Sequence, residues 1–529
     1  MRKIRVVDVT LRDGGCVIDF NFGDKNINTI LNGLNDSKVD CIEVGYIHEV
    51  KGTYSERTQF EDEKAVTQVL KGKKKSGTTY LAMIDFGTFD VEKLGERVSD
   101  GIDGIRLAFH KKDFKSIGRI GRTVIEKGYK LFVQPMLTLR YSDRELLDLI
   151  DLVNRELPDV SGVYIVDSFG EMRGNDVIRT LNLVDHNLAP QIPVGFHSHN
   201  NLQLSYSNAI SVLQFPTTRD LYLDSSIMGM GKGAGNLMSE LLMEHMNLYY
   251  GKQYEISPLL NVIDSVLNRI RANDYWGYSA EYYLSAINQC SPSYAKHFIS
   301  KHMLPINEIA ELLGCIEPPK RISFDKNYAD RLYRDYVTRN VDDSTALARL
   351  KKDFGGKTVL VLAPGRSIEE KKDEILSYID KNDVMVLTVN TIHQDFHSDY
   401  VFISNRRRYK AFCEAFHDCP TPLVCTSNIH SSAGNVYLVN YADYLCGNTD
   451  IESNAGMMAL NLMIAVGAGK LILAGFDGFG FEQHASDTLP DPMTNVEWNR
   501  MNKAISEHIS ALSKKIEVEF LTKSNYSIT

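Results

Sequence analysis

The stretch IRVVDVTLRDGG at residues 4–15 is a short β-branched run that ends in the charged residues Arg12 and Asp13. Seven similar runs follow it before residue 250, separated by segments with the period of amphipathic helices. They are CIEVGY (41–46), TYLAMIDFG (79–87), IRLAFH (105–110), LFVQPML (131–137), GVYIVDS (162–168), PVGFHSH (193–199) and LYLDSSI (221–227). Eight strand–helix repeats in about 250 residues predict an α/β fold, a parallel (β/α)8 TIM barrel.

The pattern changes twice after the predicted barrel. Residues 251–350 show helical periodicity without clear strands, and we expect a helical extension packed on the barrel. Short strands then return in VLVLAPGRS (359–367), VMVLTVN (384–390), DYVFIS (399–404) and KLILAGFDGFG (470–480). They predict a Rossmann-like open α/β domain. The expected organisation is therefore a barrel at 1–250, a helical extension at 251–350 and a second α/β domain at 355–529.

Composition places the chain among ordinary globular proteins. Of its 529 residues 43% are hydrophobic and 24% are charged, and the formal net charge is −9. The acidic balance and the lack of a long basic tract argue against nucleic acid as a partner. The sequence shows no secretory signal and no apolar run long enough to span a bilayer. We expect a cytoplasmic protein without a membrane span, assembled as a homo-oligomer.

Polar residues collect at the ends of the predicted barrel strands, where enzymes of this fold have their active sites. His197 and His199 alternate along one strand, so both imidazoles point to the same side and can share a metal ion. Asp13 offers a carboxylate at the same end of the barrel, and Asn236 offers a carbonyl oxygen after the eighth strand. This set predicts a divalent metal, Mn²⁺ first, with Zn²⁺, Co²⁺, Fe²⁺ or Mg²⁺ as alternatives. A histidine pair that faces solvent or satisfies a turn is the structural alternative.

Three motifs add a resemblance to this interpretation. TLRDGG (10–15), GFHSHNN (195–201) and GMGKGAGN (229–236) together resemble the DRE-TIM metallolyases, the superfamily of 4-hydroxy-2-oxovalerate aldolase, 3-hydroxy-3-methylglutaryl-CoA lyase and isopropylmalate synthase. GYSAEYY (277–283) is similar to the C-terminal helical region of the hydroxy-oxovalerate aldolases. The resemblance implies that Asp13, His197 and His199 bind the metal and that Arg12 faces the developing enolate.

The same resemblance implies the reaction class, a metal-dependent aldolase or carbon–carbon lyase that acts through the enolate of a 2-oxo acid such as pyruvate. An aldehyde, which could be derived from a sugar, is the second small-molecule partner. A Claisen-type synthase that uses acyl-CoA has the same barrel and metal and remains the nearest alternative.

One position departs from the aldolase pattern. Cys16 stands where those aldolases have a catalytic histidine, and a thiol of ordinary pKa is a poor base near neutral pH. Either the substrate differs or another group takes the proton. The candidate groups for this proton are His48, His110, Tyr278 and Tyr282. Ser168 and Glu43 are expected to contact substrate or support the site, with a buried structural hydrogen bond as the alternative. Lys232 is expected to grip an anionic substrate rather than form a Schiff base.

The C-terminal region carries a second candidate site. Gly365 and Ser367 lie at a predicted strand-to-helix turn, where free backbone N–H groups favour a phosphate. VLAPGRS, DYVFIS and SNAGMMALNLM together are similar to bacterial family-42 sialyltransferases and their relatives, which bind a CMP-sugar. The resemblance implies nucleotide contacts by Asn390, Ser453 and Gly456.

The Arg406–Arg408 run could contact an anionic group, but a solvated helix start is the more common meaning of such a triplet. The whole sequence therefore predicts an aldolase joined to a nucleotide-sugar-binding domain, acting in bacterial surface-polysaccharide synthesis. A CMP-sugar-dependent glycosyltransferase in the C-terminal domain is the alternative.

Overall fold

A computed structural model describes residues 2–49, 56–393, 395–416, 420–430, 435–480 and 495–526. The chain forms two compact units. The first consists of Met1–Ala295 with Arg321–Ser323, and the second of Lys296–Lys320 with Phe324–Thr529.

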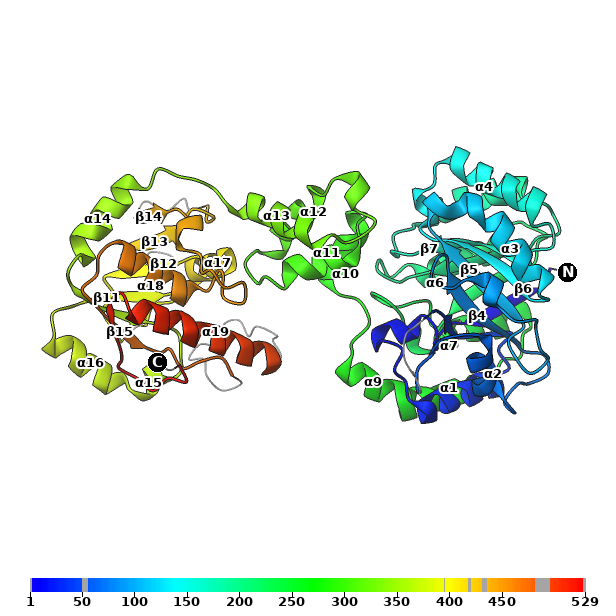
Figure 1. The fold of residues 1–529 in the computed structure, drawn as a ribbon, viewed down its shortest axis with the longest axis horizontal. Coiled ribbons are helices and arrows are strands. Elements are labelled where there is room, and N and C mark those ends of the chain that lie inside the picture. Colours follow the sequence, from blue (N-terminus) through cyan, green and yellow to red (C-terminus); the bar gives the residue numbers. More distant parts are fainter. Residues whose placement is uncertain are drawn as a thin grey trace. The chain divides into compact units, whose positions relative to one another are not determined.

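The first unit contains a closed parallel barrel (Figure 1). Its strands are β1 (Ile4–Asp8), β2 (Cys41–Ile47), β4 (Thr79–Asp85), β5 (Gly104–Phe109), β6 (Lys130–Pro135), β7 (Gly162–Asp167), β8 (Val194–Ser198) and β9 (Leu221–Ser225). Each strand pairs with the next along the chain, and β1 pairs with both β9 and β2, which closes the barrel. The two-residue strand β3 (Gln59–Phe60) adds to β2. The prediction of an eight-stranded barrel is confirmed.

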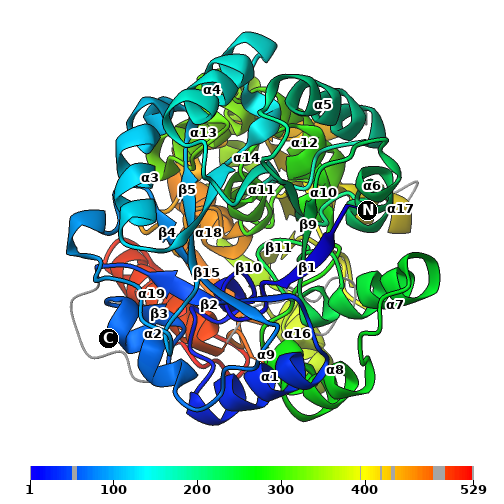
Figure 2. The same cartoon turned by 90° about the vertical axis from the view of Figure 1, so that its right-hand side faces the viewer.

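Helices cover the outside of the barrel and form a ring around the strands in Figure 2. They are α1 (Asp24–Asp36), α2 (Glu63–Leu70), α3 (Ile117–Glu126), α4 (Asp143–Glu156), α5 (Gly174–Asn187), α6 (Ser205–Gln214) and α7 (Ser239–Tyr250). Between β4 and β5 the chain forms only the short 3₁₀ turn Val91–Lys93. Apolar residues between helices and strands make up the large core of this unit.

Side chains inside the barrel change from apolar to polar toward the carboxyl ends of the strands. On β9 the buried Tyr222 is followed two residues later by Asp224, and on β2 Cys41 is followed by Glu43. A small apolar cluster fills the interior, and it contains Val7, Val9, Cys41, Leu81, Phe132, Tyr164, Val166 and Tyr222. The charged residues therefore lie above an apolar plug, at the end of the barrel where the loops carry the candidate site.

The region expected to be one helical extension is divided between the two units. The barrel unit contains α8 (Ser257–Val262), α9 (Asn268–Asn273) and α10 (Ala280–Ile287). The boundary between the two units falls within α11 (Pro292–Ile299). Helices α12 (Ile306–Gly314), α13 (Lys326–Val337) and α14 (Ser344–Phe354) belong to the second unit. Helical periodicity shows where a helix lies but not which core it joins, so the three-part division stays a prediction.

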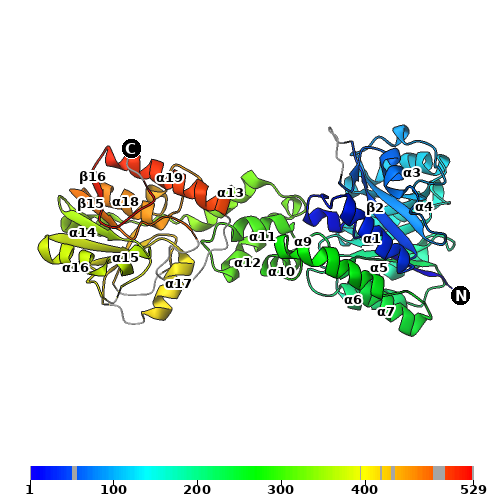
Figure 3. The ribbon, with the colours of Figure 1, turned by 90° about the horizontal axis from the view of Figure 1, so that it is seen from below.

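The second unit is an open sheet with parallel pairing throughout (Figure 3). Its strands are β10 (Thr358–Leu362), β11 (Val384–Val389), β12 (Tyr400–Ile403), β13 (Leu423–Thr426), β14 (Val436–Val439), β15 (Lys470–Ala474) and β16 (Glu517–Phe520). Their order is β14-β13-β12-β11-β10-β15-β16, as expected for a Rossmann-like domain. The helices that lie between these strands along the chain are α15 (Ser367–Glu370), α16 (Lys372–Lys381), α17 (Arg406–Ala415), α18 (Ala455–Ala465) and α19 (Asn495–Ser513).

The described part of the chain contains no helix that is both long and apolar enough to cross a bilayer.

Candidate active site

The loop after β1 folds back tightly on the end of its own strand. The backbone N–H groups of Arg12 and Asp13 both donate to the carbonyl of Val9, at 3.1 and 2.8 Å. The Thr10 hydroxyl accepts from the backbone N–H of Ile227 at 2.8 Å, which ties this loop to the loop after β9. The backbone thereby places Arg12 and Asp13 at the mouth of the barrel.

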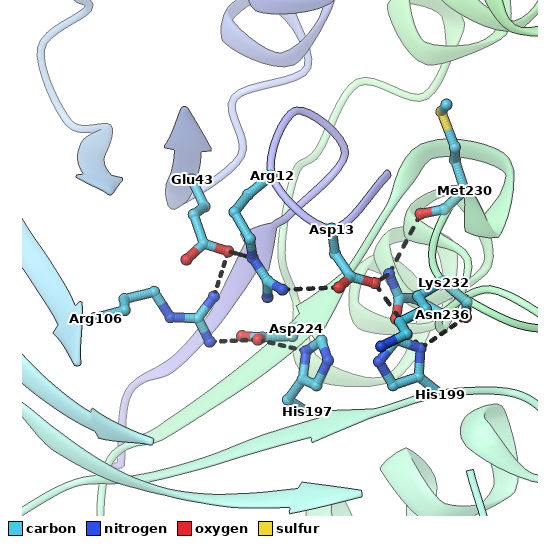
Figure 4. A network of polar contacts seen from close by, with 10 residues as sticks. All are labelled: Arg12, Asp13, Glu43, Arg106, His197, His199, Asp224, Met230, Lys232 and Asn236. Carbon is cyan, nitrogen blue, oxygen red and sulfur yellow. Dashed lines mark hydrogen bonds and ion pairs between the residues drawn. The ribbon is translucent and has the colours of Figure 1, made fainter. Parts of the chain in front are cut away.

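Three buried side chains at this mouth form a group suited to a metal ion. The ligand atoms of Asp13, His197 and His199 all lie within 4.8 Å of one another. Asn236 lies beside them and donates from Nδ2 to Asp13 Oδ2 at 2.7 Å (Figure 4). Its Oδ1 is enclosed and has no hydrogen-bond partner among the described residues. An unpartnered buried carbonyl oxygen is what a cation would satisfy.

The hydrogen bonds of the two imidazoles decide which nitrogen is available. His197 Nδ1 lies 2.9 Å from Asp224 Oδ2, and His199 Nδ1 lies 3.0 Å from the carbonyl oxygen of Lys232. Because a carboxylate and a carbonyl only accept, each Nδ1 carries the proton and each Nε2 keeps a lone pair. This is the arrangement of metal-binding histidines held by a second hydrogen bond. The donor set therefore fits a divalent cation.

Burial and charge keep the group ready to bind at neutral pH. Burial lowers the pKa of His199 to about 4, although the Asp13 carboxylate opposes the shift. Burial by itself would raise the pKa of Asp13, but His199 and Arg12 hold it well below its ordinary value. His199 is therefore neutral and Asp13 is ionised, which are the forms that bind a metal.

A continuous chain of buried ion pairs supports the group from inside the barrel (Figure 4). Arg12 donates from Nη1 to Asp13 and from Nε to Glu43, each at 2.7 Å. Arg106, which is fully buried, donates from Nη1 to Glu43 at 2.8 Å and from Nη2 to Asp224. Asp224 in turn holds His197, so the chain of contacts connects one candidate ligand to another.

The charge of this network favours an anionic ligand once a metal is present. Two guanidinium groups, Arg12 and Arg106, face three carboxylates, Asp13, Glu43 and Asp224. Their formal charge is negative by one unit, and a divalent cation would make it positive by one unit. A buried positive site next to a solvent-facing mouth attracts a carboxylate.

Arg106 and Asp224 were not predicted from the sequence. Both are charged residues inside otherwise apolar strands, at positions that alternate with the outward-facing side chains. A charge at an inward position of a buried strand is a rare event, and this signal could have identified them.

Cys16 lies on the 3₁₀ turn after Asp13. Although the residue is exposed, loss of water around the sulfur and the nearby Asp13 carboxylate raise the pKa of its thiol to about 12. The thiol therefore stays protonated at neutral pH and is a poor proton acceptor, which agrees with the sequence argument.

The other predicted catalytic residues have different surroundings. Ser168 accepts a hydrogen bond from the backbone N–H of Leu137 at 3.0 Å. A structural hydrogen bond of this kind was the expected alternative to substrate contact. Tyr278 is exposed, and Tyr282 is half-buried on α10 with a raised pKa caused mainly by burial. His110 is exposed directly after β5. Lys232 is exposed as well, and its carbonyl holds His199. The catalytic roles of these residues stay predictions.

Gly231 offers a way to disturb the ligand group with a single methyl group. A Cβ at this position would lie 2.4 Å from Asn236 Nδ2 and 2.7 Å from Asp13 Oδ2. Gly231→Ala is expected to push these side chains apart and to lower metal affinity about 10- to 100-fold, the effect of disturbing supporting contacts. Equilibrium metal titration measures it. The control is Gly174→Ala, where a Cβ meets nothing within 4 Å, and equal affinities in the two variants would contradict the assignment.

The second unit contains a cavity of about 440 Å³. It lies beyond the carboxyl ends of β10, β11 and β15, where the strand order reverses and ligands bind in open α/β sheets. Gly365, Asn390, Ser453 and Gly456, four of the five predicted nucleotide contacts, line it. Asn390 has a left-handed backbone (φ 64°), and its Oδ1 is enclosed without a partner in the described structure.

Two expectations about this unit differ from the structure. The backbone N–H and the hydroxyl of Ser367, the fifth predicted contact, donate to Asp477, and the hydroxyl also contacts Thr522 Oγ1 at 2.9 Å. Ser367 is not among the residues that line the cavity, because these internal partners occupy it. Arg406 is buried rather than solvated and pairs with Glu308, whereas Arg408 lines the cavity.

Comparisons with known proteins bear on the barrel. Residues 109–265 match the family model described as HMGL-like. The chain is 28% identical over 244 residues to a 4-hydroxy-2-oxovalerate aldolase of Geobacillus genomosp. 3, covering 46% of this chain and 70% of that protein. It is 29% identical over 276 residues to the enzyme of that name from Carboxydothermus hydrogenoformans, covering 50% and 77%.

A solved structure agrees with the fold. The N-terminal domain of a Bacteroides vulgatus protein assigned as an aldolase is 24% identical, with a TM-score of 0.51, and the match covers 58% of this chain and 99% of that domain. The sequence matches and the buried Asp–His–His group together support a metal-dependent aldolase or lyase.

Proposed function

We propose that the barrel catalyses the reversible aldol cleavage of a 4-hydroxy-2-oxo acid into a pyruvate-type 2-oxo acid and an aldehyde. The observation that carries the proposal is the buried group of Asp13, His197, His199 and Asn236, joined to Arg12 by the Asp13 carboxylate. The curated relatives named 4-hydroxy-2-oxovalerate aldolase support this substrate class.

The residues of the chain have separate tasks in this reaction. A divalent cation held by the four ligands would act as a Lewis acid toward the oxygens of the 2-oxo acid. Arg12 presents a guanidinium whose position is fixed by Asp13 and Glu43, so it can stabilise the negative charge that develops on the enolate oxygen without reorganising. Asp224 and Lys232 fix the orientation of the two histidines.

We further propose Mn²⁺ as the resident metal, with Zn²⁺, Co²⁺, Fe²⁺ and Mg²⁺ as alternatives, and a homo-oligomeric protein. A sugar-derived aldehyde would place the reaction in the synthesis of bacterial surface polysaccharides. The mixed imidazole and oxygen donors support a transition metal over Mg²⁺.

One assay separates the aldolase from the Claisen alternative. Metal-loaded protein is incubated with 4-hydroxy-2-oxovalerate and, separately, with pyruvate and acetyl-CoA. We expect release of pyruvate in the first reaction and no free CoA in the second. Release of CoA without aldol cleavage would favour the acyl-CoA synthase and contradict the proposal.

A second candidate function belongs to the cavity of the second unit. We propose that it binds a nucleotide or a nucleotide-linked sugar. Its volume falls in the range of small-molecule sites, and Gly456 lies in the N-terminal turn of α18, just after Ser453 and the N-cap Asn454. The dipole of this helix and those of its first N–H groups that the Asn454 cap leaves free favour a phosphate. Transfer of the sugar by this unit is the alternative to simple binding.

Asn390 provides the test of this cavity. Asn390→Gly keeps a residue that tolerates the left-handed backbone and removes the enclosed amide. Calorimetric titration of the full chain with CMP is expected to show about 10-fold weaker binding for this variant, the loss of a hydrogen bond to a charged or polar ligand. Gln289→Gly, at another left-handed and exposed position, is the control. Failure of the unmodified chain to bind CMP or CMP-linked sugars would contradict the proposal.

A further inference from the structure

Strand β4 ends in an aspartate that faces the barrel interior. Leu81 lies opposite Glu43 and Met83 lies opposite Arg106, and both partners belong to the interior network. Side chains two residues apart on a strand share a face, so Asp85 faces the interior as well. Its neighbour in register on β5 is Ala108, which has a small side chain.

The end of β2 lies beside Asp85 and is fixed to it through the backbone. Thr88 donates its N–H to the carbonyl of Asp85 at 3.0 Å, and Glu49 donates its N–H to the carbonyl of Thr88 at 2.9 Å. These bonds tie the loop after β2 to the loop after β4. His48, at the end of β2, therefore lies in the same part of the mouth as Asp85.

Two polar atoms in this part of the mouth are enclosed and unsatisfied. Asp85 Oδ1 and His48 Nδ1 have no hydrogen-bond partner within the described ranges of the chain. Buried polar atoms of folded proteins are almost always paired, so an exception at the mouth of a barrel points to a ligand that completes the pairing.

Arg12 connects this region to the candidate metal ligands. Its guanidinium contacts Asp13 on one side and lies over the ring of Tyr46, 5.7 Å from the centroid, on the other. Tyr46 is in register with Met83, so it faces the interior next to Asp85. A substrate held between the metal ligands and Arg12 would extend its far end toward Asp85 and His48.

The charges around Asp85 come from several elements. Burial raises the pKa of its carboxyl, while Arg12, His110 and His48 lower it and Glu43 raises it. Tyr46 and Cys16 also lie within electrostatic reach of Asp85. A carboxylate with a raised proton affinity in a partly desolvated mouth is suited to exchange a proton with substrate.

We propose that Asp85 is the catalytic acid–base group of the aldol reaction. It would supply the base that the chain lacks because Cys16 stands in place of a histidine. The proposal rests on the aldolase function proposed above. In cleavage the Asp85 carboxylate takes the proton of the C4 hydroxyl, the C3–C4 bond breaks, and its electron pair becomes the enolate of the 2-oxo acid while C4 leaves as the aldehyde. The Asp85 carboxyl then returns the proton to C3, which restores the carboxylate and completes the 2-oxo acid.

The test compares Asp85→Asn, Asp85→Ala and the unmodified protein, all loaded with Mn²⁺. Asp85→Asn is expected to retain its metal content and to lose about 10²- to 10⁴-fold in both cleavage of 4-hydroxy-2-oxovalerate and deuterium exchange of pyruvate. Asp85→Ala is expected to recover part of the activity as formate is added, because the small carboxylate can occupy the vacated space. Rescue by formate is a result that a purely structural role would not give.

Matched variants distinguish the alternatives. Asp113→Asn, on the turn after β5, is expected to keep full activity, and His48→Gln and His110→Gln test the other two candidate proton acceptors near Asp85. Full activity of Asp85→Asn, or a loss confined to His48→Gln or His110→Gln, would overturn the assignment to Asp85. An unmodified metal-loaded protein that neither cleaves the substrate nor exchanges pyruvate would instead contradict the aldolase function itself, and with it this inference.

Discussion

Replacing His199 with alanine is expected to reduce bound Mn²⁺ to a trace and to lower the rate of pyruvate enolisation about 10³-fold. The variant loses one of two imidazoles whose Nε2 is directed by a second hydrogen bond. Loss of the metal removes several kcal/mol of charge stabilisation at the enolate oxygen, and about 4 kcal/mol corresponds to 10³ in rate. Metal analysis of dialysed protein and the exchange rate of pyruvate methyl protons in D₂O measure the two effects.

The control for this substitution is His186→Ala. His186 is exposed on α5, and its ring nitrogen contacts the carbonyl of Asn182, one helical turn earlier. This variant is expected to keep its metal and its exchange rate. If His199→Ala retained both properties as fully as His186→Ala does, the candidate metal centre would be in the wrong place.

Replacing Arg106 with methionine is expected to destabilise the barrel by about 3–5 kcal/mol, the cost of breaking a buried ion pair by removing one partner. Arg106 is fully buried and pairs with both Glu43 and Asp224, and its guanidinium lies 4.7 Å from the ring centroid of Tyr164. Without it two carboxylates remain in the interior with one cation fewer. Urea denaturation followed by circular dichroism measures the change in the free energy of unfolding.

Two matched variants show whether burial causes this loss. Arg144→Met removes a guanidinium that is 85% exposed and pairs with Asp148 on the same helix, and it is expected to cost less than about 1 kcal/mol. Arg106→Lys keeps the charge but loses the planar fork, so an intermediate loss is expected. A change below about 1 kcal/mol for Arg106→Met would mean that the buried network contributes little to stability.

The barrel was predictable because each strand has a local signature. Each of the eight runs is β-branched or aromatic, and each is separated from the next by a segment of helical length, so their number alone selects the fold. The candidate metal ligands were predictable for a related reason. Strand alternation places His197 and His199 on one face, and the fold brings the end of β1 to the same mouth.

Other features depend on contacts that no local pattern reports. The partners of Ser367, Asp477 and Thr522, lie 110 and 155 residues away in the sequence, so the turn at residues 365–367 resembled an open phosphate site. The four-residue strands β13, β14 and β16 were not predicted, although β12, of the same length, was. From the sequence alone, Asp85 was treated only as part of an apolar run. Its position inside the barrel depends on the register of β4 with β2 and β5, which the local sequence does not report.

The most direct test of the central claim is the deuterium content of pyruvate after incubation with the unmodified protein in D₂O. The aldolase account predicts rapid exchange of the methyl protons in the Mn²⁺-loaded protein, loss of that exchange after treatment with EDTA, and recovery when Mn²⁺ is restored. Exchange that is absent with every divalent metal tested, or that continues undiminished in EDTA, would contradict it.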